Sequence, residues 1–564
     1  MKVVIIGGVA GGATAAARIR RLDEKAEIIV FERSGFISYA NCGLPYYIGG
    51  IIEDENDLTL QTPESFWKRF RVKMNVHHEV TAIHPDSKTI TVKNLENGTV
   101  FTESYDKLLL SPGAKPIRPN FEGIDSDKIF TLRNVEDTLK IKKYMDERHP
   151  QSAVVVGGGF IGIEVAENLR KLGIGVTLVE AADQLMSPFD SDMASFIHAE
   201  VRKNGVNLML GRMVEGFADT DCGIAIKLKD APTLHADMVV MSIGVAPETE
   251  LAKNAGLELG IKGSIVVNDK METSIPDIYA VGDAVQIKNF VTDTDTLVFL
   301  AGPANKQGRI AADNICGGDS HYTGGQGSSV IKIFDMTAAA TGINEKTAKA
   351  LGLFTDKVIL SPMSHAGYYP GGKMMTMKVI FEKETYRILG AQIVGFDGVD
   401  KRIDVLATAI RAGMKAYDLV ELDLAYAPPY SSAKDPVNMA GFIIENIKKG
   451  VVKQWYYEDD KTLPRDGSVT LLDTRTPMEY NMGHVEGFIN IPVDELRERI
   501  DELDRNKPVY VICQSGLRSY IACRILVGNG FDAYNFAGGF RFYDAVRNDK
   551  ALNSKSTPCG MDEN

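Results

Sequence analysis

Short β-branched runs that alternate with glycine-rich turns open this chain. Lys2–Ile6 has the composition of a buried parallel strand. A glycine-rich segment follows at 7–12, then a helical stretch through Arg21, and a second strand is expected at Glu27–Phe31. This order of strand, helix and strand predicts a βαβ unit of an α/β protein.

The same pattern returns after residue 151. We expect strands at Ala153–Val156 and Val176–Val179 and a helix at Ile163–Leu172 between them. The connecting turn carries a complete GxGxxG pattern, formed by Gly157, Gly159 and Gly162. Glu180 stands 18 positions after the last glycine (180 − 162), where a partner of a ribose hydroxyl is expected. The second unit therefore predicts a dinucleotide site.

The first unit carries the same pattern in a less complete form. Gly7 and Gly12 fit the first and third glycines, whereas Val9 holds the second position. Glu32 ends the second strand, as Glu180 does in the other unit. A turn of this kind can also be a plain strand-to-helix connection, so the first unit alone is the weaker indication.

From about residue 325 the periodicity changes to strands separated by glycine-rich turns. Strands are expected at Val330–Phe334, Met377–Phe381 and Arg387–Val394, and a helix at Lys401–Arg411. A polar stretch around 458–461 is interpreted as a linker. Beyond it, strands at Val469–Asp473 and Val509–Ile512 predict a separate C-terminal module.

Composition narrows the class of protein. A chain of 564 residues exceeds one ordinary core, so two to four domains are expected. A net charge of −12 argues against non-specific nucleic-acid binding. The start of the chain is broken by glycines and leads into arginines, unlike a signal peptide, and no apolar stretch reaches about 18 residues, so no membrane partner is expected.

Six cysteines without CxxC spacing predict neither a disulfide framework nor a zinc site, so no metal is expected and the reducing cytoplasm is the natural compartment. Cys42 has no second cysteine in its segment, since the next is Cys222. A lone redox cysteine must take its sulfur partner from the substrate, as a mixed disulfide or persulfide, or become a sulfenic acid.

Cys513 follows an expected buried strand and opens the loop CQSGLRS, which leads into a helix near Ser519. Successive backbone N–H groups, the helix N-terminus and Arg518 would stabilise a thiolate or a persulfide anion there. The alternative is a buried structural cysteine. Cys523 fits a helix interior, and Cys222, Cys316 and Cys559 stand in unremarkable contexts.

Longer motifs carry a resemblance to known families. The segments 108–114 (LLLSPGA) and 273–284 (TSIPDIYAVGDA) resemble those of the FAD pyridine nucleotide-disulfide oxidoreductases. The run SxxxNCGLPYYIG around Cys42 is similar to that of coenzyme A disulfide reductases, the single-cysteine class. The D-x-R, GH and NIP motifs of the tail, together with its CxxGxRS loop, closely resemble a rhodanese domain.

The resemblance implies two Rossmann-like dinucleotide-binding domains and an α+β dimerisation domain, fused to an α/β rhodanese domain. The domains implied are an FAD-binding domain at 1–150 and 255–322, an NAD(P)H-binding domain at 151–254, a dimerisation domain at 323–450, a linker at 451–464 and a rhodanese domain at 465–550. A homodimer follows, in which each subunit completes the active site of the other.

Site residues follow from the same resemblance. The FAD site is implied at Gly7, Gly8, Ala10, Gly12, Glu32, Arg33, Ser111, Gly113, Gly282, Asp283 and Ala301, and the NAD(P)H site at Gly157, Gly159, Gly162 and Glu180. Glu180 favours NADH, because a carboxylate repels the 2′-phosphate of NADPH, although NADPH stays possible. The contacts of coenzyme A (CoA), as bound substrate or co-catalyst, are implied at Thr14, Arg18, Arg21, Ser38, Asn41, Asn305 and Lys434.

Arg18 and Arg21 suit a phosphate group, or else form a solvated helix face. The resemblance also implies that two tyrosines reach the cysteine of the partner subunit. We expect Tyr368 and Tyr426 in this role; Tyr369 and Tyr430 are the alternative pair, and all four could be packing aromatics.

The fused rhodanese favours sulfane sulfur over a symmetric disulfide. We therefore predict an NADH-dependent reductase that releases hydrogen sulfide from CoA persulfide or polysulfide through Cys42 and FAD, with Cys513 relaying the sulfur. The alternatives are a CoA disulfide reductase with a separate sulfurtransferase tail, an NADH oxidase or peroxidase that cycles Cys42 through sulfenic acid, and a non-enzymatic redox-sensing or sulfur-carrier protein.

Overall fold

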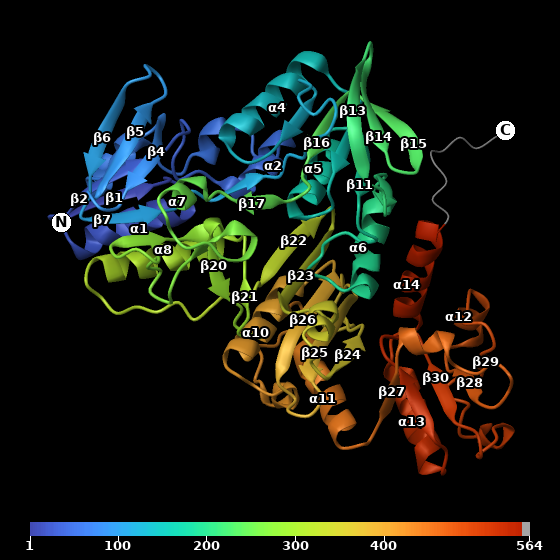
Figure 1. Cartoon of the computed structure of the whole chain (residues 1–564). Coiled ribbons are helices and arrows are strands. Elements are labelled where there is room, and N and C mark those ends of the chain that lie inside the picture. Colours follow the sequence, from blue (N-terminus) through green and yellow to red (C-terminus); the bar gives the residue numbers. More distant parts are fainter. Residues whose placement is uncertain (555–564) are drawn as a thin grey trace. The chain divides into compact units, whose positions relative to one another are not determined.

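The computed structural model describes residues 1–554, which divide into two compact units (Figure 1). Unit 1 comprises Met1–Asp183 and Gly205–Gly327. Unit 2 comprises Gln184–Asn204 and the chain from Ser328 onward. Cys559 lies outside the described residues.

The first sheet of unit 1 is parallel and runs in the order β19-β7-β1-β2-β3. These strands are β1 (Lys2–Ile6), β2 (Glu27–Phe31), β3 (Lys73–Asn75), β7 (Lys107–Leu110) and β19 (Ile278–Ala280). The strands at 2–6 and 27–31 coincide with the predicted ones, and their apolar side chains are buried on both faces, as a parallel sheet requires.

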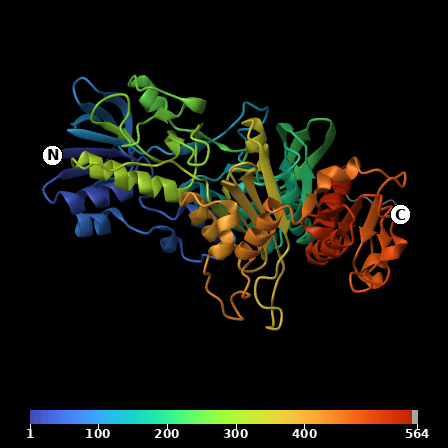
Figure 2. The same cartoon turned by 90° about the horizontal axis from the view of Figure 1, so that it is seen from below.

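Helix α1 (Ala10–Leu22) connects β1 to β2 and lies beside α8 (Ala301–Ile315), as Figure 1 and Figure 2 both show. The two helices approach closely, because a Cβ atom on Gly308 would stand 2.4 Å from the backbone oxygen of Gly11. The glycine at 308 therefore permits the close approach of α1 and α8.

The second sheet of unit 1 is also parallel, in the order β12-β11-β10-β16-β9. Its strands are β9 (Ile129–Thr131), β10 (Ser152–Val156), β11 (Gly175–Glu180), β12 (Asn207–Leu210) and β16 (Met238–Met241), with α5 (Phe160–Lys171) after β10. Two features differ from the expected range 151–254: β9 comes from before it, and α6 (Ser191–Lys203) groups with unit 2. Strand pairing between β9 and β16, remote in sequence, causes the first difference.

The remaining elements of unit 1 form small sheets and short helices around these two layers. They are α2 (Leu44–Ile48), α3 (Pro63–Phe70), β4 (His78–His84), β5 (Thr89–Asn94), β6 (Val100–Ser104), β8 (Ala114–Pro116), α4 (Val135–Arg148), β13 (Val214–Thr220), β14 (Gly223–Leu228), β15 (Ala231–Ala236), β17 (Val245–Pro247), α7 (Glu250–Asn254), β18 (Ile265–Val266), β20 (Val285–Lys288) and β21 (Asp295–Thr296).

The first part of unit 2 is an antiparallel sheet in the order β22-β23-β26-β25-β24. Its elements are β22 (Ser329–Ile333), β23 (Met336–Gly342), α9 (Glu345–Ala350), β24 (Thr355–Leu360), β25 (Met375–Glu382), β26 (Ile388–Gly395), α10 (Val399–Arg411) and α11 (Pro436–Lys448). The predicted strands and helix correspond to β22, β25, β26 and α10, with small shifts at their ends.

The C-terminal part of unit 2 is a parallel sheet in the order β27-β31-β30-β28-β29. Its elements are β27 (Lys453–Trp455), β28 (Thr470–Asp473), α12 (Pro477–Asn481), β29 (Ile489–Asn490), β30 (Val509–Ile512), α13 (Leu517–Gly528), β31 (Ala533–Phe536) and α14 (Gly539–Ser554).

The stretch 451–464, expected to be a linker, is part of this fold. Within it, β27 pairs with β31, and a 3-10 helix covers Tyr457–Lys461. Trp455 is buried against Phe536, with ring centroids 4.4 Å apart, and its Nε1 donates to the backbone oxygen of Val511 at 3.3 Å. Only Trp455 of this three-residue strand is apolar, so its pattern did not predict a strand.

Within unit 2, the C-terminal module contacts the antiparallel sheet and α6 of the same chain. The Tyr456 hydroxyl donates to Asp356 at 2.6 Å, and the Asp549 carboxylate lies 2.8 Å from Nδ1 of His198. Among residues 1–554, no helix is long and apolar enough to cross a membrane.

Candidate functional site

The two glycine-rich turns have the same backbone geometry. Gly7 and Gly157 have φ of +97° and +108°, which side-chain-bearing residues rarely adopt. A Cβ atom on Gly12 or on Gly162 would lie 1.9 Å from the backbone oxygen of Gly7 or of Gly157. Both predicted patterns therefore rest on a steric requirement at their first and third glycines.

The second position of the pattern differs between the turns. Val9 has φ −103°, and Gly159 has φ −82°. Because φ is negative at both positions, valine fits the first turn without backbone strain. A Cβ atom on Gly159 would meet nothing within 4 Å, which leaves space for a pyrophosphate near the N-terminus of α5.

The predicted ribose partners occupy equivalent places in the two turns. The Gly8 amide donates to Oε2 of Glu32 at 2.9 Å, and the Gly158 amide donates to Oε2 of Glu180 at 2.6 Å. The other oxygen of each carboxylate accepts the amide two residues after it, from Ser34 or Ala182. Each carboxylate is thus held at its turn, where a Rossmann-type fold places the partner of a ribose hydroxyl.

The remaining candidates for FAD gather around the first turn. Ser111 and Gly113 follow β7, with the Ser111 amide bonded to the Ile6 oxygen at 2.8 Å. Gly282 has φ +83° and donates its amide to Gln307 at 2.7 Å, while Ala301 begins α8. The guanidinium of Arg33 is bound at 2.6 and 2.8 Å by Glu248.

Asp283 supplies the test of whether FAD fits. Its burial raises the pKa of the carboxyl to about 6. A carboxyl in that setting is stabilised by hydroxyl donors, and a ribityl chain carries several. The glycine turn, the acid at the ribose position and this buried acid therefore fit a bound FAD.

Cys42 lies in a 3-10 helix, Asn41–Gly43, directly before α2. The residue is exposed, yet partial burial of its thiol raises the pKa, with smaller contributions from the carboxylates of Glu164 and Asp283. Partial burial and these two carboxylates therefore disfavour the Cys42 thiolate.

Glu164 and Tyr46 are neighbours of Cys42 that the sequence analysis missed. Tyr46 lies one turn after Cys42 on α2, which packs against α5, and its hydroxyl hydrogen-bonds Glu164. Burial, followed by the charge of Glu167, raises the pKa of Glu164 to about 7. The only sequence signal was an acid two residues after Gly162, which does not reveal the contact.

The structure brings some of the implied CoA contacts together. The Thr14 hydroxyl donates to Asn305, and the Ser38 amide donates to the Gly8 oxygen at 2.9 Å. Arg18 is bound by Asp313 at 2.7 Å, and Arg21 and Asn41 are exposed. Lys434 is exposed on unit 2.

Tyr368 and Tyr426 meet on the antiparallel part of unit 2. Their hydroxyl oxygens are 2.6 Å apart, and their side chains are 75% and 46% exposed. Tyr369 instead packs edge-on against His365, and Tyr430 lies apart, 72% exposed. This geometry favours the pair Tyr368 and Tyr426 over the alternative pair.

A buried arginine holds the loops that carry these tyrosines. Arg402 of α10 donates to the backbone oxygens of Ser364 and Tyr430, at 2.9 and 3.3 Å. It also binds the carboxylate of Asp435 at 3.1 Å, and Asp435 caps α11. The sequence predicted the helix of Arg402 but gave no indication of this role.

Cys513 ends β30 and is fully buried. Its Sγ accepts the Gly516 amide at 3.1 Å and the Ser519 hydroxyl at 3.2 Å. The sulfur also lies at the N-terminal end of α13, and the backbone amide of Phe540, at the start of α14, donates to the Cys513 oxygen at 2.7 Å. These donors fit a thiolate or a persulfide anion.

The Cys513 loop, residues 513–519, is bordered by an ion pair. Arg518 donates to both oxygens of Glu479 at 2.7 and 2.8 Å, and its guanidinium lowers the pKa of Glu479 to about 2. The positive charge of Arg518 interacts most strongly with Glu479 and also with Cys513, so its role at the sulfur stays a prediction. The sequence analysis gave Glu479 no role.

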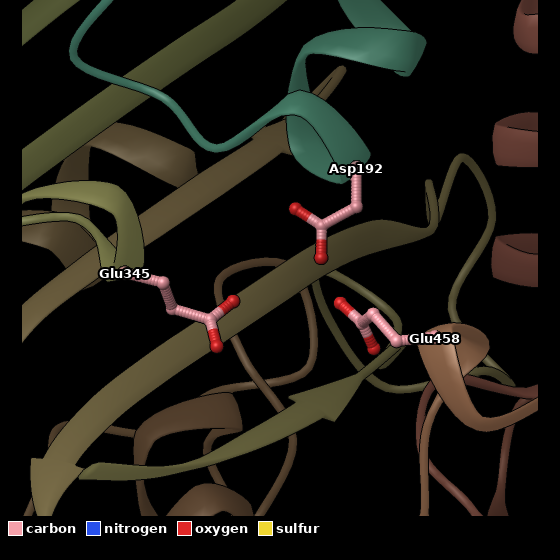
Figure 3. Close-up of side chains that lie close together, drawn as sticks. All are labelled: Asp192, Glu345 and Glu458. Atoms are coloured by element: carbon pink, nitrogen blue, oxygen red, sulfur yellow. The ribbon is translucent and has the colours of Figure 1, made fainter. Parts of the chain in front are cut away.

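Asp192, Glu345 and Glu458 point toward one another in unit 2 (Figure 3). Lysine ammonium groups already occupy their surroundings: Lys378 binds Asp192 at 2.8 Å and also Glu345, and Lys357 binds Glu345 and Glu458 at 3.0 and 3.1 Å. Burial alone would lower the pKa of Lys378. The surrounding carboxylates raise it by more, so the pKa lies above its ordinary value. The cluster is an ion-pair network that joins α6 and α9 to the C-terminal module.

Three family models match successive parts of the chain. Residues 1–308 match the pyridine nucleotide-disulphide oxidoreductases, 328–436 match the dimerisation domain of the same proteins, and 458–545 match a rhodanese-like domain. The order of these matches is the order of domains that the sequence motifs implied.

Individual relatives cover from about three quarters to nearly all of the chain. A coenzyme A disulfide reductase of Staphylococcus aureus (strain JH9) is 38% identical over 443 residues, which is 78% of this chain and 99% of that protein. The crystal structure of reduced Bacillus anthracis CoADR-RHD is 49% identical, with a TM-score of 0.95 over 97% of this chain and 98% of the other. A NAD-dependent persulfide reductase from A. fulgidus is 38% identical, with a TM-score of 0.91 over 96% of this chain and 100% of the other.

Proposed function

Because this chain belongs to the pyridine nucleotide-disulphide oxidoreductase family, we propose that it reduces sulfur–sulfur bonds with electrons from NADH. Its substrates are CoA persulfide and polysulfide sulfur, and its product is hydrogen sulfide. Glu180 at the second glycine turn supports NADH over NADPH, because a second negative charge at the 2′ position would face a carboxylate.

When bound, FAD supplies the route by which electrons from NADH reach the sulfur of Cys42. The residues of the first turn, together with Asp283, hold it. Cys42 attacks the persulfide of CoA and breaks its sulfur–sulfur bond. Attack on the inner sulfur releases sulfide and leaves a Cys42–CoA mixed disulfide. Attack on the outer sulfur releases the CoA thiolate and leaves a Cys42 persulfide. In a homodimer, the pair of Tyr368 and Tyr426 donates one hydrogen bond to the departing sulfur of the other subunit, because one hydroxyl donates to its neighbour and leaves the other to donate to the sulfur.

The observation that carries the persulfide proposal is the hydrogen bonding of Cys513. Two donors and a helix N-terminus surround a buried sulfur, which is the environment that stabilises a persulfide anion. A symmetric disulfide has no sulfane sulfur to place there. Cys513 therefore accepts sulfur from the donor and passes it on to CoA.

The test is anaerobic NADH oxidation together with sulfide release, with CoA persulfide and CoA disulfide compared as substrates. We expect CoA persulfide to give the higher kcat/KM, with stoichiometric sulfide. A faster reaction with the disulfide and no sulfide would contradict the proposal. That result would instead support the second candidate, a CoA disulfide reductase with a separate sulfurtransferase tail, which the similarity to the Staphylococcus aureus reductase favours.

A further inference from the structure

An ion-paired arginine and three exposed apolar side chains border the Cys513 loop. Leu517, at the start of α13, is 65% exposed directly before Arg518. Met478 and Met482 flank Glu479 on and just after α12, 73% and 80% exposed. The ion pair between Arg518 and Glu479 joins the two helices, so the apolar residues border the same pair.

Glu479 is fixed in place by more than Arg518. Its Oε2 also accepts the amide and the hydroxyl of Thr476, both at 2.9 Å, in the capping box of α12. The low pKa of Glu479 follows from the Arg518 contact and these donors, so the carboxylate is charged throughout the physiological range. Arg518 is therefore ion-paired with Glu479 throughout the physiological pH range.

The other arginines close to the loop are also engaged. Arg475 is buried and binds Asp473 at 2.7 Å, with its guanidinium over the ring of Phe540. The backbone amide of Arg541 donates to the Gln514 oxygen in the loop. The Arg541 side chain instead donates to Thr376 of β25 at 2.6 Å. The positive charges around Cys513 are therefore either paired or directed elsewhere.

These observations bear on which sulfur donor can reach Cys513. In sulfur transfer from an organic persulfide, the Cys513 thiolate attacks the terminal sulfur of R–S–S⁻, forms Cys513–S–S⁻ and releases R–S⁻. With thiosulfate it attacks the outer sulfur and releases sulfite, a dianion. Thiosulfate brings two negative charges on the reacting group itself and so needs compensating positive charge beside a thiolate. An organic persulfide brings one negative charge at its reacting sulfurs, needs less compensation and gains from apolar contact along its carbon chain.

We propose that Glu479 and Leu517 make the Cys513 loop selective for sulfane sulfur carried on an organic thiol, against the inorganic dianion thiosulfate. Glu479 neutralises Arg518, and Leu517 presents an apolar side chain where a cation would attract the dianion. This inference rests on the proposed role of Cys513 as a sulfur acceptor and names the class of donor that the loop accepts.

The experiment measures thiocyanate formation from cyanide by the full-length holoenzyme, with glutathione persulfide or thiosulfate as the donor. This assay does not require NADH, so it is independent of the reductase activity. In wild type we expect kcat/KM for glutathione persulfide to exceed that for thiosulfate at least 100-fold, and Cys513→Ser to abolish both. Equal or better use of thiosulfate by wild type would overturn the proposal.

Two variants test the residues separately. Glu479→Gln keeps an acceptor for Thr476 but removes the charge that neutralises Arg518, and Leu517→Lys adds a cation without touching the ion pair. Each should raise kcat/KM for thiosulfate at least tenfold and change that for glutathione persulfide less than threefold. Glu486→Gln is the remote control and should leave the ratio unchanged. Leu517→Gln removes the apolar contact without adding charge, so it should lower kcat/KM for glutathione persulfide about two- to threefold and leave that for thiosulfate unchanged.

An unchanged donor ratio in both Glu479→Gln and Leu517→Lys, with circular dichroism like that of wild type, would also reject the inference. Failure of the proposed function has a different signature. If NADH oxidation with CoA persulfide is absent while thiocyanate formation shows the predicted donor preference, the selectivity stands and the reductase proposal falls.

Discussion

Cys513 and Cys42, the two candidate sulfur sites, differ in burial and in the groups around their sulfur atoms. Cys513 is fully buried at the end of a strand, where an amide and a hydroxyl donate to its Sγ at 3.1 and 3.2 Å. Cys42 is exposed in a 3-10 helix, and burial and neighbouring carboxylates raise its pKa. Donors of its own loop hydrogen-bond the Cys513 sulfur, whereas the proposed partners of Cys42 are a cofactor, a substrate and a second subunit.

This difference follows from the local structure of each segment. A strand that runs into a loop and a helix N-terminus directs consecutive amides toward one point, so the Cys513 site is complete within seven residues. Cys42 lies where the flavin ring, CoA and the partner's tyrosines are proposed to meet. A site completed by other molecules can respond to whether they are present, whereas a self-contained site is ready at all times.

The largest effect is expected from removing Cys42 itself. Cys42→Ser should lower NADH-dependent sulfide release at least 1,000-fold, because serine cannot form the sulfur–sulfur intermediate. Thiocyanate formation at Cys513 should stay within twofold of wild type, since that site is self-contained. Cys222→Ser is the matched control and should change neither rate; loss of both activities in Cys42→Ser would mean that the sites are not separable.

The tyrosine pair should give the next largest effect. Tyr368→Phe and Tyr426→Phe should each lower kcat for NADH-dependent persulfide reduction roughly 10- to 100-fold, as expected for loss of a hydrogen bond to a departing anion. Because the two hydroxyls share one 2.6 Å hydrogen bond, the double variant should lose much less than the product of the single effects. Tyr430→Phe serves as control, and multiplicative losses would contradict a shared role.

Ser519→Ala tests how much one donor contributes to the Cys513 thiolate. A hydrogen bond to a charged group contributes about 1.5–3 kcal/mol, so the variant should lower kcat/KM for sulfur transfer from glutathione persulfide to cyanide about 10- to 100-fold. The measurement is thiocyanate formation by the full-length holoenzyme. Ser515→Ala is the neighbouring control. An unchanged rate would mean that the Ser519 hydroxyl does not stabilise the sulfur.

The smallest effect concerns the pH dependence at Cys42. The pKa of Glu164 is raised to about 7, so its carboxyl is mostly neutral at pH 6 and mostly charged at pH 8. The charged form disfavours the Cys42 thiolate. Glu164→Gln should therefore match wild type in alkylation of Cys42 at pH 6 and react about threefold faster at pH 8, while Glu96→Gln should not differ; a constant ratio across this range would exclude the coupling.

The parts of the site that sequence could predict are those built from neighbouring residues. Gly12 and Gly162, Glu32 and Glu180, and the loop after Cys513 each depend on spacing within a short segment, and spacing is visible in a sequence. The pair of Arg18 and Asp313 joins residues 295 positions apart, and the contact of Tyr46 with Glu164 joins α2 to α5. Nothing in the local pattern reports such contacts, so Arg18 was read as available and Glu164 was missed.

The same distinction between local patterns and contacts of distant segments applies to the fold. The βαβ units and the strand before Cys513 were predicted because β-branched runs and glycine turns mark them. The short strands β9 and β27 were missed, since three residues carry too little periodicity and their pairing partners, β16 and β31, are distant in the chain.

Strand β27 also determines where the C-terminal module can be cut from the chain. The rhodanese-like match begins at residue 458, after this strand. A fragment that starts there would leave the edge of β31 unpaired, open to pairing with other chains, and would empty the space that Trp455 fills beside Phe536. A stable excised domain must therefore begin before Lys453, because the strand that closes its sheet lies ahead of the rhodanese-like match.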